Sequence, residues 1–195
     1  MPPCAADPGP RYDAARPVLK EALAMPDRPV LHHLSPDPSL AGRPVGTYGQ
    51  TLVDALAAAG WRVAPTALPG AYPRVDQSAI LAADIALSRL PDGAWVLVDG
   101  LALPGLAGGI AADNRRLRFV ALVEWPLWRD PGLPADEAAA LRNLEQGALA
   151  LMRRVLVPST AVAAEMTAFG LPSDAVVVIS SDDDGAQRLA ALLSA

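Results

Sequence analysis

Two carboxylates and two indoles follow an apolar stretch near the middle of the chain. Glu124 and Trp125 come directly after the apolar residues 120–123, and Trp128 and Asp130 follow closely. Paired carboxylates can divide into an acid and a base when their surroundings separate their pKa values, and indoles offer flat surfaces on which sugars stack. We therefore predict Glu124 and Asp130 as candidate catalytic residues. Trp125 and Trp128 are the matching candidates for substrate binding, unless the segment is a surface turn in which the indoles are merely packed.

Asp99 and Gly100 stand where another apolar stretch ends. At the carboxyl end of a parallel strand, Asp99 can bind a hydroxyl-rich ligand and Gly100 permits close approach of the backbone. Asp-Gly is also common turn chemistry, in which the Asp caps the following helix. The second interpretation is favoured for the dipeptide alone, and both residues stay candidates for substrate binding.

Gly46, Thr47 and Tyr48 mark the entry to an expected helix. Backbone N–H groups at a helix N-terminus bind anions, so these three residues are further candidates for substrate binding. A plain helix entry explains them equally well.

The sequence lacks the residues and motifs that several common kinds of catalysis and cofactor binding require. Cys4 is the only cysteine, and the adjacent His32 and His33 are the only histidines, placed on opposite faces of an expected strand. No nucleophile elbow of the form G-x-S-x-G and no dinucleotide fingerprint G-x-G-x-x-G occurs. We predict no metal site and no nicotinamide or flavin cofactor.

Glu137 and Glu145 form the pattern E-x7-E within an expected helix. Helices rich in Ala, Leu and Glu produce such pairs by chance. We interpret both as part of a solvated helix face.

The elements that must position these residues alternate regularly. Short apolar runs bounded by turn signals predict strands, and Ala/Leu-rich stretches predict helices, which together indicate a mostly parallel sheet covered by helices. The predicted strands are residues 29–34, 62–67, 95–98, 118–123, 155–158 and 175–179. The predicted helices are residues 47–59, 77–90, 105–115, 135–152, 160–169 and 185–194. The fold class is α/β, a single Rossmann-like three-layer domain over residues 29–195.

Composition limits the remaining possibilities. The chain has 195 residues, of which 52% are hydrophobic, enough for one well-buried core. A net charge of -5 leaves no basic stripe for nucleic acid. Residues 1–28 read as a proline-rich, partly disordered appendage without the apolar core of a signal peptide, and no run is long enough to cross a membrane. We predict a cytoplasmic protein for which peripheral membrane contact stays open.

Several short sequence motifs follow one another along the chain in a definite order. They are residues 48, 52–56, 60–63, 68–73, 90–93, 96–102, 120–133, 145 and 154–159. Taken together, they resemble the N-terminal, acceptor-side domain of the family-four (group 1) GT-B glycosyltransferases. The resemblance implies one Rossmann-like half that binds an acceptor and faces a second half that holds a nucleotide-sugar donor, with sugar transfer between them and usually no metal ion.

The sequence departs from that family at three places. Residues 43–46 replace the family's double glycine, and Glu124 and Trp125 replace its histidine-rich turn. The chain ends soon after residues 176–179, where the donor-binding domain is expected to begin, so we expect that domain to be absent. The donor-binding E-x7-E belongs to the missing half and does not carry over to Glu137 and Glu145.

We therefore predict the acceptor-side half of a nucleotide-sugar-dependent glycosyltransferase, either truncated or one subunit of a split enzyme. Its partners would be a hydroxyl-bearing acceptor and a donor-binding domain or subunit, or a second copy of itself. One alternative is a non-catalytic binding or regulatory module derived from the fold. The other is a stand-alone α/β hydrolase or transferase that uses Glu124 and Asp130.

Overall fold

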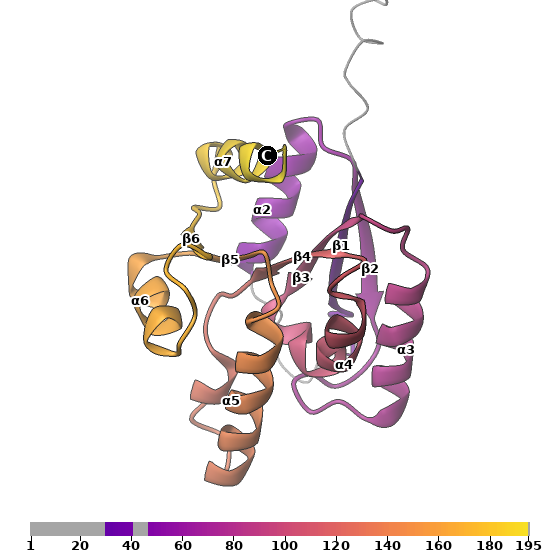
Figure 1. Cartoon of the computed structure of the whole chain (residues 1–195), viewed down its shortest axis with the longest axis vertical. Helices are drawn as coiled ribbons and strands as arrows, with labels where there is room; N and C mark the ends of the chain where they lie inside the picture. The colour runs from indigo at the N-terminus through magenta and orange to yellow at the C-terminus, as the bar shows by residue number, and fades with distance from the viewer. Residues whose placement is uncertain (1–29, 41–46, 195) are drawn as a thin grey trace, which may run out of the picture.

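Six strands alternate with helices along the residues that the computed structural model describes, 30–40 and 47–194 (Figure 1). The strands are β1 (Leu31–Pro36), β2 (Val63–Leu68), β3 (Trp95–Asp99), β4 (Arg118–Leu122), β5 (Arg154–Val157) and β6 (Val176–Val178). The helices are α2 (Thr47–Ala58), α3 (Gln77–Ser88), α4 (Leu103–Asp113), α5 (Ala135–Leu149), α6 (Thr160–Ala168) and α7 (Asp183–Ser194), with short 3-10 turns η1 (Gly100–Ala102) and η2 (Leu127–Arg129). The predicted alternation is confirmed, and the predicted ends differ from these by a few residues at most.

All the described strands are parallel, in the order β2-β1-β3-β4-β5-β6. A mostly parallel sheet was expected, because each strand is followed by a crossover helix. The chain moves from β1 outward to β2, then returns past β1 to build β3 to β6 on the other side. The strand order therefore reverses between β1 and β3, and ligands of such sheets bind beyond the carboxyl ends at this point.

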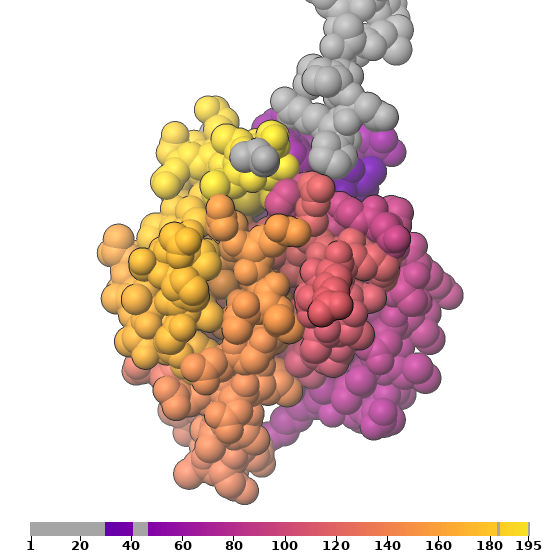
Figure 2. Space-filling view, viewed as in Figure 1, coloured from indigo at the N-terminus to yellow at the C-terminus, as the bar shows by residue number. Residues whose placement is uncertain are grey.

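Helices cover both faces of the sheet, which makes the predicted three-layer, Rossmann-like α/β domain. One buried cluster joins α2 and α7 to the sheet through Leu52, Leu56, Leu97, Val120 and Leu189. The other cluster lies under α3, α4, α5 and α6, and these helices occupy the side of the molecule seen in Figure 2. Residues 96–98 and 119–122 are buried. Because these strands are covered on both faces, their sequence is almost continuously apolar.

Side chains and glycines set several helix ends. Asp76 caps α3 by accepting a hydrogen bond from the Ala79 N–H at 2.8 Å, and Ser159 caps α6 in the same way. Gly60 and Gly170, at φ of 83° and 102°, reverse the chain after α2 and α6. Each glycine therefore ends its helix.

α4 begins earlier than the predicted Gly105. Its first residue is Leu103, and Pro104 lies in its first turn, where a missing N–H costs no hydrogen bond. Gly105 has another role, since a Cβ there would lie 2.9 Å from the Tyr72 hydroxyl oxygen. The glycine therefore lets the Tyr72 ring pack against the start of α4.

No helix within residues 47–194 is long and apolar enough to cross a membrane. The predicted appendage, residues 1–28, lies outside the described residues.

Candidate functional site

The candidate residues gather along the carboxyl edge of the sheet. Asp99 ends β3, Glu124 follows β4, and Thr47 begins α2. Gly46 lies outside the described residues. The edge therefore brings together most of the positions singled out in the sequence, including those at the reversal between β1 and β3.

Asp99 is held against its own turn. Its carboxylate accepts a hydrogen bond from the Leu101 N–H at 2.8 Å and caps η1, as the turn interpretation predicts. A Cβ added to Gly49 would lie 3.6 Å from Asp99 Oδ2, so the carboxylate also faces the first turn of α2. Burial raises the pKa of Asp99 to about 6, the negative charge of Glu124 adds to the rise, and the hydrogen bond from Leu101 opposes it.

This raised pKa predicts a pH-dependent contribution to stability. Because the folded-state pKa of Asp99 is about 6 rather than the ordinary 3.8, folding favours the protonated carboxyl. The stabilisation that the protonated Asp99 carboxyl gives the fold is complete below the ordinary pKa. It is lost as the pH rises through the pKa of the folded state. We expect the free energy of unfolding of the native protein, relative to Asp99→Asn, to fall between about pH 4 and about pH 7. Urea denaturation of both proteins measures it, and a pH-independent difference would contradict the assignment.

Gly100 permits a close approach, but to the sheet itself. A Cβ at this position would lie 2.8 Å from the Leu122 carbonyl oxygen. The turn after β3 therefore packs directly on the end of β4.

Tyr48 is built into the core at the start of α2. Its hydroxyl donates a hydrogen bond to the Ile179 carbonyl oxygen at 2.9 Å, and its side chain is buried. Burial raises the pKa of Tyr48, and the charge of Glu124 raises it further. Thr47, in contrast, is exposed. Glu124 thus acts electrostatically on Tyr48 and Asp99, on the reversal side of the edge.

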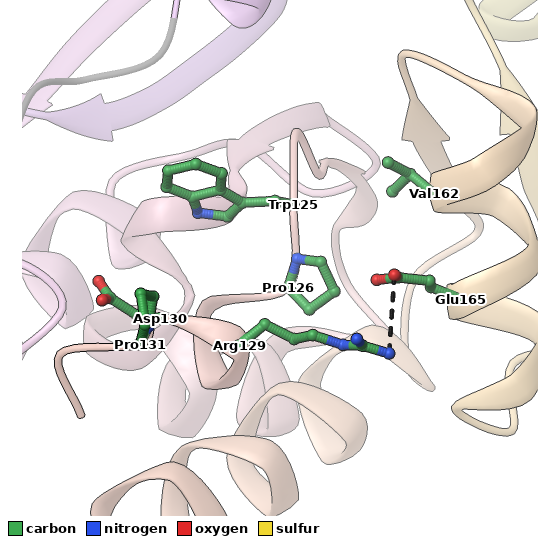
Figure 3. Close-up of a pocket in the computed structure, with 7 residues that line it drawn as sticks. All are labelled: Trp125, Pro126, Arg129, Asp130, Pro131, Val162 and Glu165. Carbon is green, nitrogen blue, oxygen red and sulfur yellow. Dashed lines mark ion pairs between the residues drawn. The ribbon is translucent and has the colours of Figure 1, made fainter. Parts of the chain in front are cut away.

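A hollow of about 350 Å³ opens between the loop after β4 and α6 (Figure 3). We call it the Trp125 hollow, and it is lined by Trp125, Pro126, Arg129, Asp130, Pro131, Val162 and Glu165. Trp125 is 53% exposed. Arg129 extends across the floor from the loop after β4 to α6, where its Nη2 lies 3.6 Å from Glu165 Oε1. The hollow thus combines an indole, a guanidinium and two carboxylates.

Asp130 lines a second, neighbouring hollow of about 270 Å³ as well. Ala71, Tyr72, Pro73 and Arg74, from the connection after β2, form its far wall. Asp130 therefore stands between two depressions on the same edge. Glu124 lines neither of them, so the structure does not bring the two predicted catalytic carboxylates into one hollow.

The two predicted stacking indoles differ in their surroundings. The Trp128 ring packs against Phe169, with ring centroids 5.7 Å apart. The guanidinium carbons of Arg129 and Arg142 lie 4.9 and 5.4 Å from its centroid. Protein groups therefore cover Trp128, and Trp125 is the indole that faces the hollow.

Glu145 corrects the interpretation of the E-x7-E pattern. It is 1% exposed, and its Oε1 and Oε2 accept hydrogen bonds from the Leu127 and Trp128 N–H groups, both at 3.1 Å. Glu137 is solvated as expected and pairs with Arg74. Eight residues rotate a helix by about 80° beyond two full turns, enough to turn one glutamate inward.

Burial raises the pKa of Glu145 to about 7, against the two N–H donors that lower it. The carboxylate ties η2 to α5, and η2 carries Arg129 of the Trp125 hollow. Glu145 is therefore a positioning residue for this loop. This inward role was not predicted, because nothing in the local sequence marks the N–H groups that Glu145 satisfies.

Val162 and Glu165 line the Trp125 hollow but were not among the residues predicted from the sequence. They come from α6, and only the tertiary fold places this helix beside the loop after β4. The histidines lie elsewhere, with His33 buried and its pKa lowered by burial to about 4. Within residues 30–40 and 47–194 no group of three or more His, Cys, Asp or Glu side chains is arranged to hold a metal ion.

The six-stranded parallel sheet with helices on both faces is that of a Rossmann-like α/β domain. Its candidate site lies at the carboxyl ends of the strands. No protein-family model matches the sequence, and no curated protein matches it.

Proposed function

We propose that this chain is the acceptor-side domain of a glycosyltransferase of the GT-B type. The observation that carries the proposal is the Trp125 hollow, an indole beside mixed charges at the carboxyl edge of a parallel sheet. Ligands of such sheets bind at this edge. The order of sequence words that resembles the GT-B acceptor domain supports the same assignment.

The chemistry of the hollow suits a hydroxyl-bearing acceptor. An indole packs against the apolar face of a sugar ring, while carboxylates accept and guanidinium groups donate hydrogen bonds at its hydroxyls. Trp125 supplies the apolar surface, and Arg129, Asp130 and Glu165 supply the polar groups. A sugar or another polyol is the ligand class that fits this mixture.

Glu124 is the candidate general base. In the proposed reaction the acceptor hydroxyl oxygen attacks the anomeric carbon of a nucleotide sugar, the bond to the nucleotide diphosphate breaks, and Glu124 takes the hydroxyl proton. Glu124 is exposed and adjoins Trp125 in the chain; because it lines neither hollow, the role requires an acceptor that extends from the indole to this carboxylate. The donor would be held by a second domain, on the same polypeptide or on another subunit, because positional catalysis needs both substrates fixed.

Trp125→Ala tests acceptor binding. We expect the dissociation constant for the best ligand of a methyl glycoside panel to rise by about tenfold, since most of the stacking surface is lost. The melting temperature should stay unchanged, because the indole is half exposed. Isothermal titration calorimetry measures the binding. Leu81→Ala is the matched control, since Leu81 is an exposed apolar residue of α3 away from the hollow. Equal affinities of the Trp125→Ala protein and the native protein would refute this binding site.

A non-catalytic binding module is the second candidate. This candidate is favoured because polar groups near the reversal between β1 and β3 already bond to the protein itself. The Asp99 carboxylate caps η1, and the Tyr48 hydroxyl bonds to the Ile179 carbonyl oxygen. Turnover assays with nucleotide sugars separate the two functions. Transfer to a methyl glycoside that requires Glu124 and appears only with a donor-binding partner supports the half-enzyme, and binding without transfer under any pairing supports the module. Transfer by the purified chain alone, abolished in Glu124→Gln, would contradict both.

A further inference from the structure

Three arginines gather at the opposite, amino edge of the sheet. Arg118 and Arg154 are the first residues of β4 and β5, and Trp95 is the first residue of β3. With Arg153 and Leu192 they line a hollow of about 470 Å³, which we call the arginine hollow. It lies at the end of the sheet away from the proposed acceptor site, so the proposed function does not use it.

Strand register places these side chains on one face. Trp95 pairs with Arg118, and Arg154 pairs with Val120. Paired residues of neighbouring strands share a face, and so do alternate residues of one strand. Val120 belongs to the cluster that packs under α7. The two guanidinium groups therefore leave adjacent strands toward the same side, near the end of α7 where Leu192 lies.

Local contacts orient the arginines but leave donors unused. The Arg118 guanidinium lies over the Trp95 ring at 5.4 Å from its centroid, and Arg154 Nη1 donates to the Arg153 carbonyl oxygen at 2.7 Å. No carboxylate of the described residues lies within ion-pair distance of Arg118, Arg153 or Arg154. Arg116, by comparison, is tied to Asp113 at 2.9 Å. Each guanidinium carries five N–H donors, so most of those in the hollow face solvent.

We propose that the arginine hollow binds the phosphate groups of a small phosphorylated molecule. Guanidinium groups bind phosphate through paired, charge-assisted hydrogen bonds, and three of them match the charge of a diphosphate. Like charges repel one another, so an anion bound among the three guanidinium groups of the hollow relieves a repulsion that the fold otherwise retains. The competing explanation is that the arginines only stabilise the C-terminal end of α7, whose last turn has no basic residue.

Calorimetric titration of the full chain with inorganic diphosphate at low ionic strength tests the proposal. We expect saturable binding whose dissociation constant rises at least about tenfold in Arg118→Gln/Arg154→Gln, since each substitution removes charge-assisted hydrogen bonds. The matched control is Arg89→Gln/Arg115→Gln, which removes the same charge from exposed arginines outside the hollow. Its affinity should stay within about twofold of the native protein.

Three results would overturn the proposal. The first is no binding of diphosphate by the native protein, and the second is equal weakening by the control substitutions. The third is flotation of the native protein with phosphatidylglycerol vesicles but no binding of free diphosphate, which would assign the arginines to a lipid surface. A melting temperature lowered by the Arg118→Gln/Arg154→Gln pair, without any diphosphate binding, would favour the role at α7 instead.

Discussion

Replacing Glu145 with alanine is expected to lower the free energy of unfolding by about 3 to 5 kcal/mol, among the largest single effects in this chain. The substitution removes both acceptors of the Leu127 and Trp128 N–H groups and leaves a void under η2 within the buried end of α5. A buried N–H without a partner costs its full desolvation energy. Urea denaturation followed by circular dichroism measures the loss.

Two control variants separate this role from a general helix effect. Glu137→Ala removes the exposed glutamate of the same helix, with its surface ion pair to Arg74, and should cost less than about 1 kcal/mol. Glu145→Gln keeps the size and one acceptor, and should fall between the two alanine variants. If Glu145→Ala were as stable as Glu137→Ala, Glu145 could not be the group that holds the loop.

Gly100→Ala is expected to destabilise the fold by about 2 kcal/mol or more. Its Cβ would lie 2.8 Å from the Leu122 carbonyl oxygen, a backbone atom that cannot rotate away. Either the turn after β3 or the end of β4 must shift, and both carry the candidate site. The free energy of unfolding and methyl glycoside binding of the variant are the two measurements.

The control for Gly100→Ala is Gly108→Ala. Gly108 is exposed on α4, and a Cβ there would meet no atom within 4 Å, so alanine should stabilise the helix by up to about 1 kcal/mol. A Gly100→Ala protein with native stability would show that the turn can move without cost.

The sequence predicted the fold well because its signals are local. Apolar runs such as residues 95–98, and stops such as Gly60 and Gly170, fix each strand and helix without reference to the rest of the chain. Parallel pairing and helices on both faces then follow from the alternation of strands and helices.

The candidate site was predicted only where strand ends define it. Asp99 ends β3, and Trp125 and Asp130 lie in the connection after β4, so all three stand at the carboxyl edge of the sheet. Glu165 reaches the same hollow from α6, and Glu145 turns inward from α5, through packing between segments far apart in the chain. No local pattern reports a contact of that kind, so the sequence pointed to the edge without showing how its parts are held.

The bond from Tyr48 to Ile179 joins residues that lie 131 positions apart. α2 packs beside α7 on the same face of the sheet, so this side of the core is closed only when α7 is in place (Figure 1). On the ribosome, the first strands and α2 emerge with that apolar face uncovered until α7 has been synthesised. The Tyr48–Ile179 bond beside the strand reversal therefore forms only after residue 179 has emerged, long after Tyr48 itself has been made.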